Sequence, residues 1–276
     1  MRTKISLLLC FCVLVMCTAS TSAIGSTSEA SDETTKDGVT IKTAKDSYTF
    51  EDKKIPYVIN NRSGHDVEIS SSRGSLQKKN GDEWVTMPST WEDPMAWCGV
   101  QGSVIKREMK STISFSDYNG TLFTGTYRIS FSCQSQEGSE YFTASSNEFT
   151  LTGDFPVPNG RTDQATFYLA FDNNEVPKSA PQITYKIVNT VSAELYISPD
   201  IMLALYQNSE WHIIHYETGQ NGELVSHDKE NVRTIHADKL PNGFENCSKL
   251  RVIERVATPS THANRVFYLI QEIKLN

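Results

Sequence analysis

Large apolar side chains alternate with smaller or polar ones in residues 55–61, IPYVINN. Ile55, Tyr57 and Ile59 share one face and the residues between them share the other, which is the period of two of a β-strand with one buried face. Further short segments of the same kind follow, separated by turn residues such as Asn80-Gly81. Short strands spaced at about ten residues predict a β-sandwich.

A second copy of this pattern begins at Ile183, at an offset of 128 residues (183 − 55). After one deletion the offset becomes 127, so that Trp84 matches Trp211. The identical pairs are Ile55/Ile183, Tyr57/Tyr185, Ile59/Ile187, Asn61/Asn189, Ile69/Ile197, Ser70/Ser198, Leu76/Leu203, Glu83/Glu210 and Trp84/Trp211. Roughly two identities would arise by chance in such a window. The repeat predicts two domains of one architecture, and 276 residues are enough for two separate cores.

Strand patterning places the first domain at residues 38–153 and the second at residues 163–276. Between them, residues 154–162 (DFPVPNGRT) contain two prolines and a glycine, a composition typical of a linker. No segment has the period of an amphipathic helix, so the sequence predicts an all-β protein.

The N-terminus has the pattern of an export signal. Two basic residues precede the apolar stretch Ile5–Met16, which is too short to span a bilayer as a mature helix. Small residues offer cleavage after Ala19 or Ala23, and the second of these would define a signal peptide of residues 1–23.

A lipoprotein signal is the alternative reading of the same region. Leu14–Cys17 is similar to a bacterial lipoprotein box that would lipidate Cys17, although Met16 stands where such boxes have a small residue. Residues 24–37 are mostly Ser, Thr, Ala and acidic residues, so we expect a disordered tether. The sequence therefore predicts an exported protein and leaves open whether it is released or tethered by a lipid.

The charge of the chain argues against a nucleic-acid partner. The formal net charge is −7 and the isoelectric point is near 5.4, and no cluster of Lys and Arg is present to bind phosphates. The membrane is expected as a partner only through the lipid anchor.

Three motifs in the first domain occur together: an apolar strand ending in Asn61, a Gly-Asp-Glu-Trp segment ending at Trp84, and L-x-x-G-T-Y-R-I at Leu122–Ile129. Together they resemble bacterial immunoglobulin-like domains of the Bacillus type, which occur on exported proteins and lipoproteins of Gram-positive bacteria. The second domain matches in its front half and departs after Gly243. The resemblance implies two tandem immunoglobulin-like β-sandwich domains at the cell envelope, and it brings no catalytic residues.

Three cysteines lie in the folded part of the sequence: Cys98, Cys133 and Cys247. Export permits disulfides, and Cys98 and Cys133 share the first domain, so we predict that these two are bonded. Cys247 is then left over, buried or free. The alternative is that all three are reduced and buried.

Catalytic and metal-binding patterns are absent from the sequence. The six histidines do not cluster, and His212 and His215 should face opposite sides of one strand. No nucleophile elbow, zinc motif or phosphate-binding glycine loop is found. We therefore expect a non-catalytic protein without metal or cofactor; a secreted enzyme with an unrecognised site is the less favoured alternative.

The most unusual segment is PSTWEDPMAWCGVQGS at residues 88–103, which places Trp91, Met95 and Trp97 between strands. Loops at the ends of a sandwich often carry a binding surface, and aromatic side chains supply large contact area there. Such a surface would make the protein a carbohydrate-binding or adhesive module, with an unknown protein or glycan of the cell envelope as partner. The alternative is that these side chains cover one end of the core.

Overall fold

The structure, a computed structural model, describes residues 38–69, 74–89, 103–118, 120–136, 141–157, 167–217, 222–226, 229–258 and 265–276. Within these ranges the regular elements are β-strands and three short 3-10 helices. None of the helices in these ranges has the length and apolar character needed to cross a membrane.

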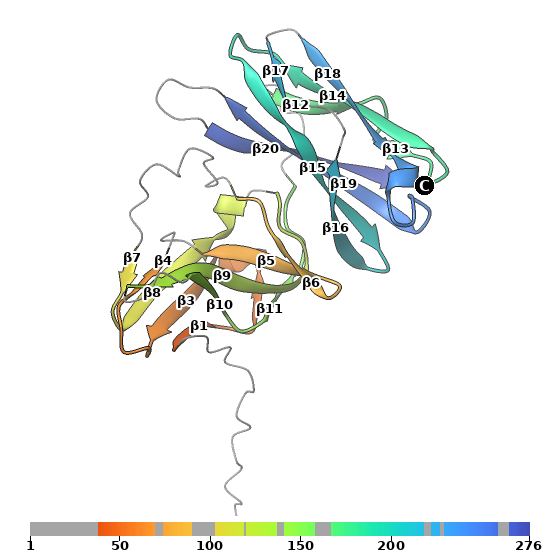
Figure 1. Cartoon of the computed structure of the whole chain (residues 1–276). Coiled ribbons are helices and arrows are strands. Elements are labelled where there is room, and N and C mark those ends of the chain that lie inside the picture. The colour runs from red at the N-terminus through yellow and green to blue at the C-terminus, as the bar shows by residue number, and fades with distance from the viewer. Residues whose placement is uncertain are drawn as a thin grey trace, which may run out of the picture. The chain divides into compact units, whose positions relative to one another are not determined.

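Strands β1–β11 form two sheets, which are orange to green in Figure 1. One sheet has the order β1-β3-β8; the other has the order β2-β11-β9-β4-β7, with β10 and β5 also paired to β9 and β6 paired to β5. The bounds are β1 Val39–Thr43, β2 Ser47–Thr49, η1 Phe50–Asp52, β3 Lys54–Asn61, β4 Val67–Ile69, β5 Ser75–Asn80, β6 Glu83–Thr86, β7 Ser103–Ile105, β8 Glu108–Ser114, η2 Phe115–Tyr118, β9 Gly125–Ser135, β10 Tyr141–Ser145 and β11 Phe149–Thr152. These two sheets are called the first sandwich below.

Strands β12–β20 form two further sheets, with the orders β12-β14-β18 and β13-β20-β19-β15-β16, and β17 pairs with β15. The bounds are β12 Phe167–Phe171, β13 Glu175–Val176, β14 Gln182–Asn189, β15 Leu195–Gln207, β16 Glu210–Glu217, β17 Glu223–Val225, β18 Glu230–His236, η3 Ala237–Lys239, β19 Cys247–Thr258 and β20 Arg265–Leu275. With this second sandwich the predicted fold class is confirmed: the described residues form an all-β structure of several sheets, consistent with immunoglobulin-like β-sandwich domains.

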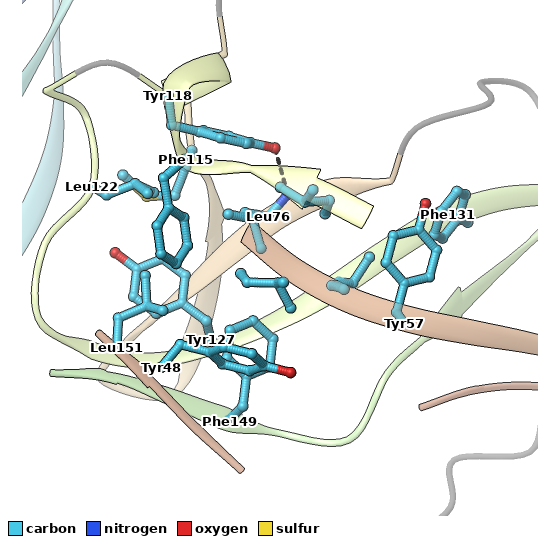
Figure 2. Packing of buried hydrophobic residues seen from close by; sticks show 14 of the residues in the cluster. Tyr48, Tyr57, Leu76, Phe115, Tyr118, Leu122, Tyr127, Phe131, Phe149 and Leu151 are labelled. Atoms are coloured by element: carbon cyan, nitrogen blue, oxygen red, sulfur yellow. Dashed lines mark hydrogen bonds between the residues drawn. The ribbon is translucent and has the colours of Figure 1, made fainter. Parts of the chain in front are cut away.

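The alternating pattern that predicted strands is present in both copies. Along β3 and β14 the same positions are buried. Ile55, Tyr57 and Ile59 face the first core, and their counterparts Ile183, Tyr185 and Ile187 face the second. Figure 2 shows the Tyr57 ring among the buried side chains of the first core, near Phe131. A strand buried on one face requires this period, since successive side chains point to opposite sides of a sheet.

Asn61 and Asn189 end these two strands and make equivalent hydrogen bonds. Each side-chain amide donates to the carbonyl oxygen four residues later and to a more distant carbonyl, and each amide oxygen accepts from the backbone nitrogen two residues later. The partners are His65, Ile105 and Ser63 for Asn61, and Ala193, Val225 and Val191 for Asn189, at 2.6 to 3.0 Å. Because an Asn side chain can satisfy several backbone groups of a turn at once, the repeated residue builds the same turn twice.

Within the L-x-x-G-T-Y-R-I motif, the side chain of Tyr127 bonds back to the turn that precedes β9. The Tyr127 hydroxyl donates to the carbonyl oxygen of Phe123 (2.8 Å) and accepts from the nitrogen of the same residue (3.1 Å). This is the arrangement of a tyrosine corner, in which a core tyrosine bonds to the backbone a few residues upstream. A second core tyrosine, Tyr118, accepts a hydrogen bond from the nitrogen of Leu76, drawn as the dashed line in Figure 2. Both bonds anchor the turn before β9 to the core.

Cys133 and Cys247 are buried, free thiols in this structure. Burial raises the pKa of Cys133 to about 11. Burial also raises the pKa of Cys247, whose sulfur accepts a hydrogen bond from Nε2 of Gln207 at 2.9 Å. No disulfide joins the described cysteines, and Cys98 lies outside the described residues, so the Cys98–Cys133 bond stays a prediction.

The first residues of the expected linker pack on the first sandwich. Phe155 is buried, and its ring lies 5.9 Å from that of Phe50 and 5.5 Å from that of Phe115, edge to face. Limited proteolysis of the folded protein should therefore cut within residues 154–162 on the C-terminal side of Phe155, where the composition is that of a linker. Sequencing of the first stable fragments checks this, and fragments that end inside residues 55–84 or 183–211 would contradict two separately folded domains.

Candidate functional site

Several residues predicted to carry function, namely Cys17, Trp91, Met95, Trp97 and Cys98, lie outside the described residues. The chain that leads to Trp91 is held in place, because the Thr121 hydroxyl donates to the carbonyl oxygen of Pro88 at 2.8 Å and Thr121 is fully buried. The segment that contains Trp91 and Trp97 therefore leaves the first sandwich from a fixed point.

The two histidines of β16 face opposite sides of the strand, as predicted. His212 is paired across the sheet with Leu205, which lies in the second core, and His215 is paired with Met202, which does not. No group of three or more His, Cys, Asp or Glu suited to a metal occurs among the described residues.

Two buried cations, Lys78 and Arg251, lie where the two sandwiches meet. We call this site the joint; its residues are Lys78, Asn80 and Phe123 of the first sandwich and Trp211, Ile213 and Arg251 of the second. The sheet of β15, β16, β19 and β20 supplies an outward face that is apolar, and this face packs into the same cluster as the core of the first sandwich. Its members are Met202, Ala204, Trp211, Ile213, Ile253 and Ile270.

The apolar run Ile201–Tyr206 owes its composition to this packing. Ile201, Leu203 and Leu205 belong to the second core, whereas Met202 and Ala204 belong to the cluster shared with the first sandwich. A strand that is buried on both faces reads as a continuous apolar run instead of an alternating one.

Arg251 on β19 is the central residue of the joint. Its guanidinium is almost fully buried (4% exposed) and lies over the rings of Phe123 and Trp211, at 4.6 and 4.9 Å from their centroids. Its Nη1 donates to the carbonyl oxygens of Gly120 (3.2 Å) and Leu122 (3.4 Å) in the first sandwich. The planar guanidinium can stack and donate at the same time, which makes Arg suited to a buried contact.

Glu272 on β20 neutralises this arginine. Nη2 of Arg251 lies 2.8 Å from Oε2 of Glu272, and Lys249 lies 3.1 Å from Oε1 of the same carboxylate. Burial lowers the pKa of Arg251, while the carboxylate raises it. Burial alone would raise the pKa of Glu272, but the hydrogen bonds and charges of Arg251 and Lys249 bring it below its ordinary value. The pair is therefore charged at neutral pH.

The first sandwich presents its acceptors to Arg251 because its turn is fixed. The Tyr127 corner holds Phe123 by both its backbone nitrogen and its oxygen, and this turn contains Leu122 and Gly120. The ring of Phe123 lies 5.0 Å from that of Trp211. The L-x-x-G-T-Y motif thus does two things: it ends a loop of the first sandwich and it shapes the surface that receives the second.

Lys78 adds a second cation to the joint from the other side. It is 4% exposed, and its Nζ donates to the carbonyl oxygen of Trp211 at 2.8 Å. Burial lowers the pKa of Lys78, while Glu210 opposes this. Gly125, with a φ of 142°, makes room for this amine, since a Cβ there would lie 3.0 and 3.2 Å from Cε and Nζ of Lys78. The glycine of the motif is thus required both by its backbone angle and by the lysine.

Asn80, the last residue of β5, pairs with the edge strand β16. Its Nδ2 donates to the carbonyl oxygen of Ile213 (2.9 Å), and its Oδ1 accepts from the nitrogen of Ile213 (3.0 Å). The side-chain amide thus replaces the peptide group of a neighbouring strand. An edge strand leaves such groups unpaired and open to other chains, so this contact protects β16 as well as joining the sandwiches.

A second buried polar cluster lies inside the second sandwich. Glu254 on β19 is fully buried, and its Oε1 accepts a hydrogen bond from the Tyr185 hydroxyl (2.5 Å) and lies 3.7 Å from Nε of the buried Arg233. Arg233 also donates to the carbonyl oxygens of Ser198 (2.8 Å) and Pro199 (3.4 Å). These carbonyls belong to a bulge in β15, where the register with β19 shifts between Ile197 and Ile201.

The first sandwich has apolar or small residues at the matching positions. Tyr185 matches Tyr57, and their register partners on the next strand are Arg233 and Ser111. Ile197 and Ile69 are paired with Val256 and Cys133, so that Glu254 occupies the position of Phe131. The two sandwiches therefore share a frame but differ in the middle of the core, where, among the described residues, the second contains an ion pair and the first does not.

One sequence signal for the joint lies in a difference between the two copies. Trp84 and Arg128, with the guanidinium 4.4 Å from the ring centroid, occupy in the first sandwich the positions of Trp211 and Arg251. Around them the first sandwich carries polar residues where the second is apolar: Gln77 matches Ala204 and Thr86 matches Ile213. A change from polar to apolar on the outward face of one copy indicates that this face is covered.

Comparisons with known proteins gave one family match and similarities to solved structures. No curated protein matches the chain. Among solved structures, the YadV chaperone shares 10% identity and a TM-score of 0.29 over 85% of this chain and 100% of that one. A structure described as a chaperone–tip adhesin complex of CFA/I fimbriae biogenesis shares 13% identity and a TM-score of 0.27, over 86% and 98% of the two chains.

A DUF3823 family protein from Bacteroides ovatus shares 17% identity with this chain and a TM-score of 0.22, over 76% and 91% of the two chains. With all three TM-scores below 0.5, these similarities do not establish a common overall structure. The family comparison is more specific: it is residues 35–150, the region of the first sandwich, that match the model of the bacterial Ig-like domain.

Proposed function

We propose that this protein is an exported or surface-tethered bacterial protein that acts without catalysis, as a binding or structural module built of two immunoglobulin-like domains in tandem. The match of residues 35–150 to the bacterial Ig-like domain supports the class of the first domain. The repeated residues, among them the equivalent turns at Asn61 and Asn189, support extending it to the second. The signal pattern before residue 24 supports export, and the family resemblance supports a Gram-positive envelope.

The observation that carries this proposal is that the buried charged side chains make structural contacts within and between the sandwiches. Lys78 and Arg251 hold one sandwich to the other, Glu272 pairs with Arg251, and Arg233 and Glu254 hold strands within the second. A catalytic site would instead place such groups around an open cleft, where they reach a substrate. Charged side chains that hold the fold rigid suit a protein that presents fixed surfaces to a partner, because a preordered surface loses little entropy on binding.

The contact surface we propose is the segment around Trp91, Met95 and Trp97, with a protein or glycan of the envelope as partner. The hydrogen bond from the Thr121 hydroxyl to the carbonyl oxygen of Pro88 supports it, since the chain just before this segment is held by the first sandwich. A glycan ligand would make the protein a carbohydrate-binding or adhesive module. A partner that binds elsewhere would leave the tandem as a structural module.

Replacing Trp91 and Trp97 by Ala, singly and together, tests this surface. We expect each change to weaken binding by on the order of 2 kcal/mol or more and to leave the melting temperature nearly unchanged. The measurements are thermal unfolding of the purified variants, and binding of residues 24–276 to a glycan array and to envelope extract, each compared with the unmodified chain. Losses of roughly 3–5 kcal/mol in stability at both positions would show instead that these rings cover the core.

A further inference from the structure

We propose that the second sandwich contains a proton-operated element, in which Glu254 takes up and releases a proton inside the core and thereby changes how firmly Arg233 holds the bulge of β15 at residues 198–200. This goes beyond the proposed binding role and does not depend on it. The first sandwich, with Phe131 at the matching position, has no such element there.

The carboxylate is closed off from solvent and only partly satisfied. Glu254 is fully buried; its Oε1 accepts from Tyr185, while its Oε2 accepts no hydrogen bond within the part of the chain that the structure describes. The nearest cation, Arg233 Nε, stands at 3.7 Å, which is longer than a hydrogen bond. A carboxylate held this way is stabilised as an anion only weakly, so its proton is easily retained.

The groups around Glu254 come from each neighbouring element. Tyr185 faces it from β14 and Arg233 from β18, and its register partners on β15 and β20 are the apolar Ile201 and Leu269. Tyr216 of β16 lies close enough to Tyr185 to raise the pKa of that phenol, after burial and Glu254 itself. Among these groups Glu254 is the one that changes charge near neutral pH.

Burial raises the pKa of Glu254 to about 7, and the opposing effects of Arg233 and Tyr185 do not cancel it. In the unfolded chain the carboxyl releases its proton near the ordinary value of 4.5. Between these two values the folded protein binds more protons than the unfolded one. The contribution of Glu254 to stability is therefore fully present below about pH 4.5 and is lost as the pH rises through about 7.

The bulge senses this change through Arg233. When Glu254 is neutral, the guanidinium has the carbonyl oxygens of Ser198 and Pro199 and the side chain of Asn231 as its partners. When Glu254 is charged, the anion competes with those carbonyls for the same cation, so the bulge is held less firmly.

Ser198 and Asp200 connect the bulge to a cavity at the protein surface. Both belong to the bulge and line a cavity of about 290 Å³ to which both sandwiches contribute, along with Thr86, Pro88, His215 and Arg255. A proton bound in the core of the second sandwich is thus linked to the edge of the joint.

Hydrogen–deuterium exchange of the full chain between pH 5.5 and 8 tests the proposal. After correction for the intrinsic pH dependence of exchange, we expect the amides of Ile197, Ser198, Asp200 and Ile201 to exchange at least about threefold faster at pH 8 than at pH 5.5. Glu254→Gln, which stays neutral, should abolish this difference. The matched control Glu230→Gln, which removes an exposed carboxylate paired with Lys186, should keep it.

Equal exchange at the two pH values in the unmodified chain, or the same difference in Glu254→Gln, would overturn the proposal. If Glu254→Gln does not fold, carboxyl-carbon NMR titration of Glu254 in the unmodified protein decides the matter. A midpoint between pH 6 and 8 supports the element, near the value of about 7 expected from burial, and a midpoint below about 5 refutes it.

Discussion

Replacing Arg251 by Ala is expected to lower the free energy of unfolding by about 2–4 kcal/mol, because one side chain joins the two sandwiches through several contacts. The change removes the hydrogen bonds to Gly120 and Leu122 and the stacking on Phe123 and Trp211. It also leaves Glu272 with Lys249 as its remaining cation. Urea unfolding followed by circular dichroism measures the loss.

Arg128→Ala is the matched control, because the same residue type occupies the same repeat position in the first sandwich. Arg128 stacks on Trp84 and donates to Gln77 at 2.8 Å, but it is half-buried and has no contact with the second sandwich among those of the described residues. We expect a loss below about 1 kcal/mol. Equal losses for the two variants would mean that Arg251 acts within its own sandwich and that the joint contributes little.

Replacing Arg233 by Ala is expected to have the larger effect, about 3–5 kcal/mol at pH 8, because it leaves Glu254 buried without a cation. The loss should be smaller at pH 5, where Glu254 is protonated in the folded state, since its pKa is already raised by burial before the arginine is removed. Urea unfolding of the variant and the unmodified protein at both pH values checks the size and the direction of the effect.

The first sandwich supplies the design of a compensating variant. Arg233→Ser together with Glu254→Phe copies Ser111 and Phe131, which occupy the matching positions next to Tyr57. Replacing a buried ion pair by well-packed apolar residues is often neutral or stabilising, so the double variant should regain most of the stability lost in Arg233→Ala. A double variant as unstable as the single one would show that the two cores differ in shape as well as in charge.

The alternation of residues fixed the strands in advance. Ile55, Tyr57 and Ile59, and their copies from Ile183, could be assigned from sequence because the period of two follows from backbone geometry within a single strand. The internal repeat in turn predicted two sandwiches, and Asn61 and Asn189 could be paired because one turn chemistry serves both. These are local properties, so one sequence suffices to read them.

In the segment Leu250–Val256 the local sequence does not indicate which charged residues are buried. The segment lies in strand β19, but nothing within its sequence distinguishes Arg251, Glu254 and Arg255 from solvent-facing charges. In the structure the first two are buried, one against the first sandwich and one inside the second. Their burial depends on Phe123 and Tyr185, which are far away in the chain.

By itself, then, the sequence determined the all-β class and the repeated strand pattern, and it predicts export, because each depends on residues that are neighbours in the chain. Only the tertiary structure decided which outward face is covered, which charges are buried and how Asn80 reaches the edge at Ile213. The physical reason is that burial is a property of the partner surface. Arg128 and Arg251 occupy the same position in a repeat and stack on the same kind of ring, yet of the two it is Arg251 that is covered by the other sandwich.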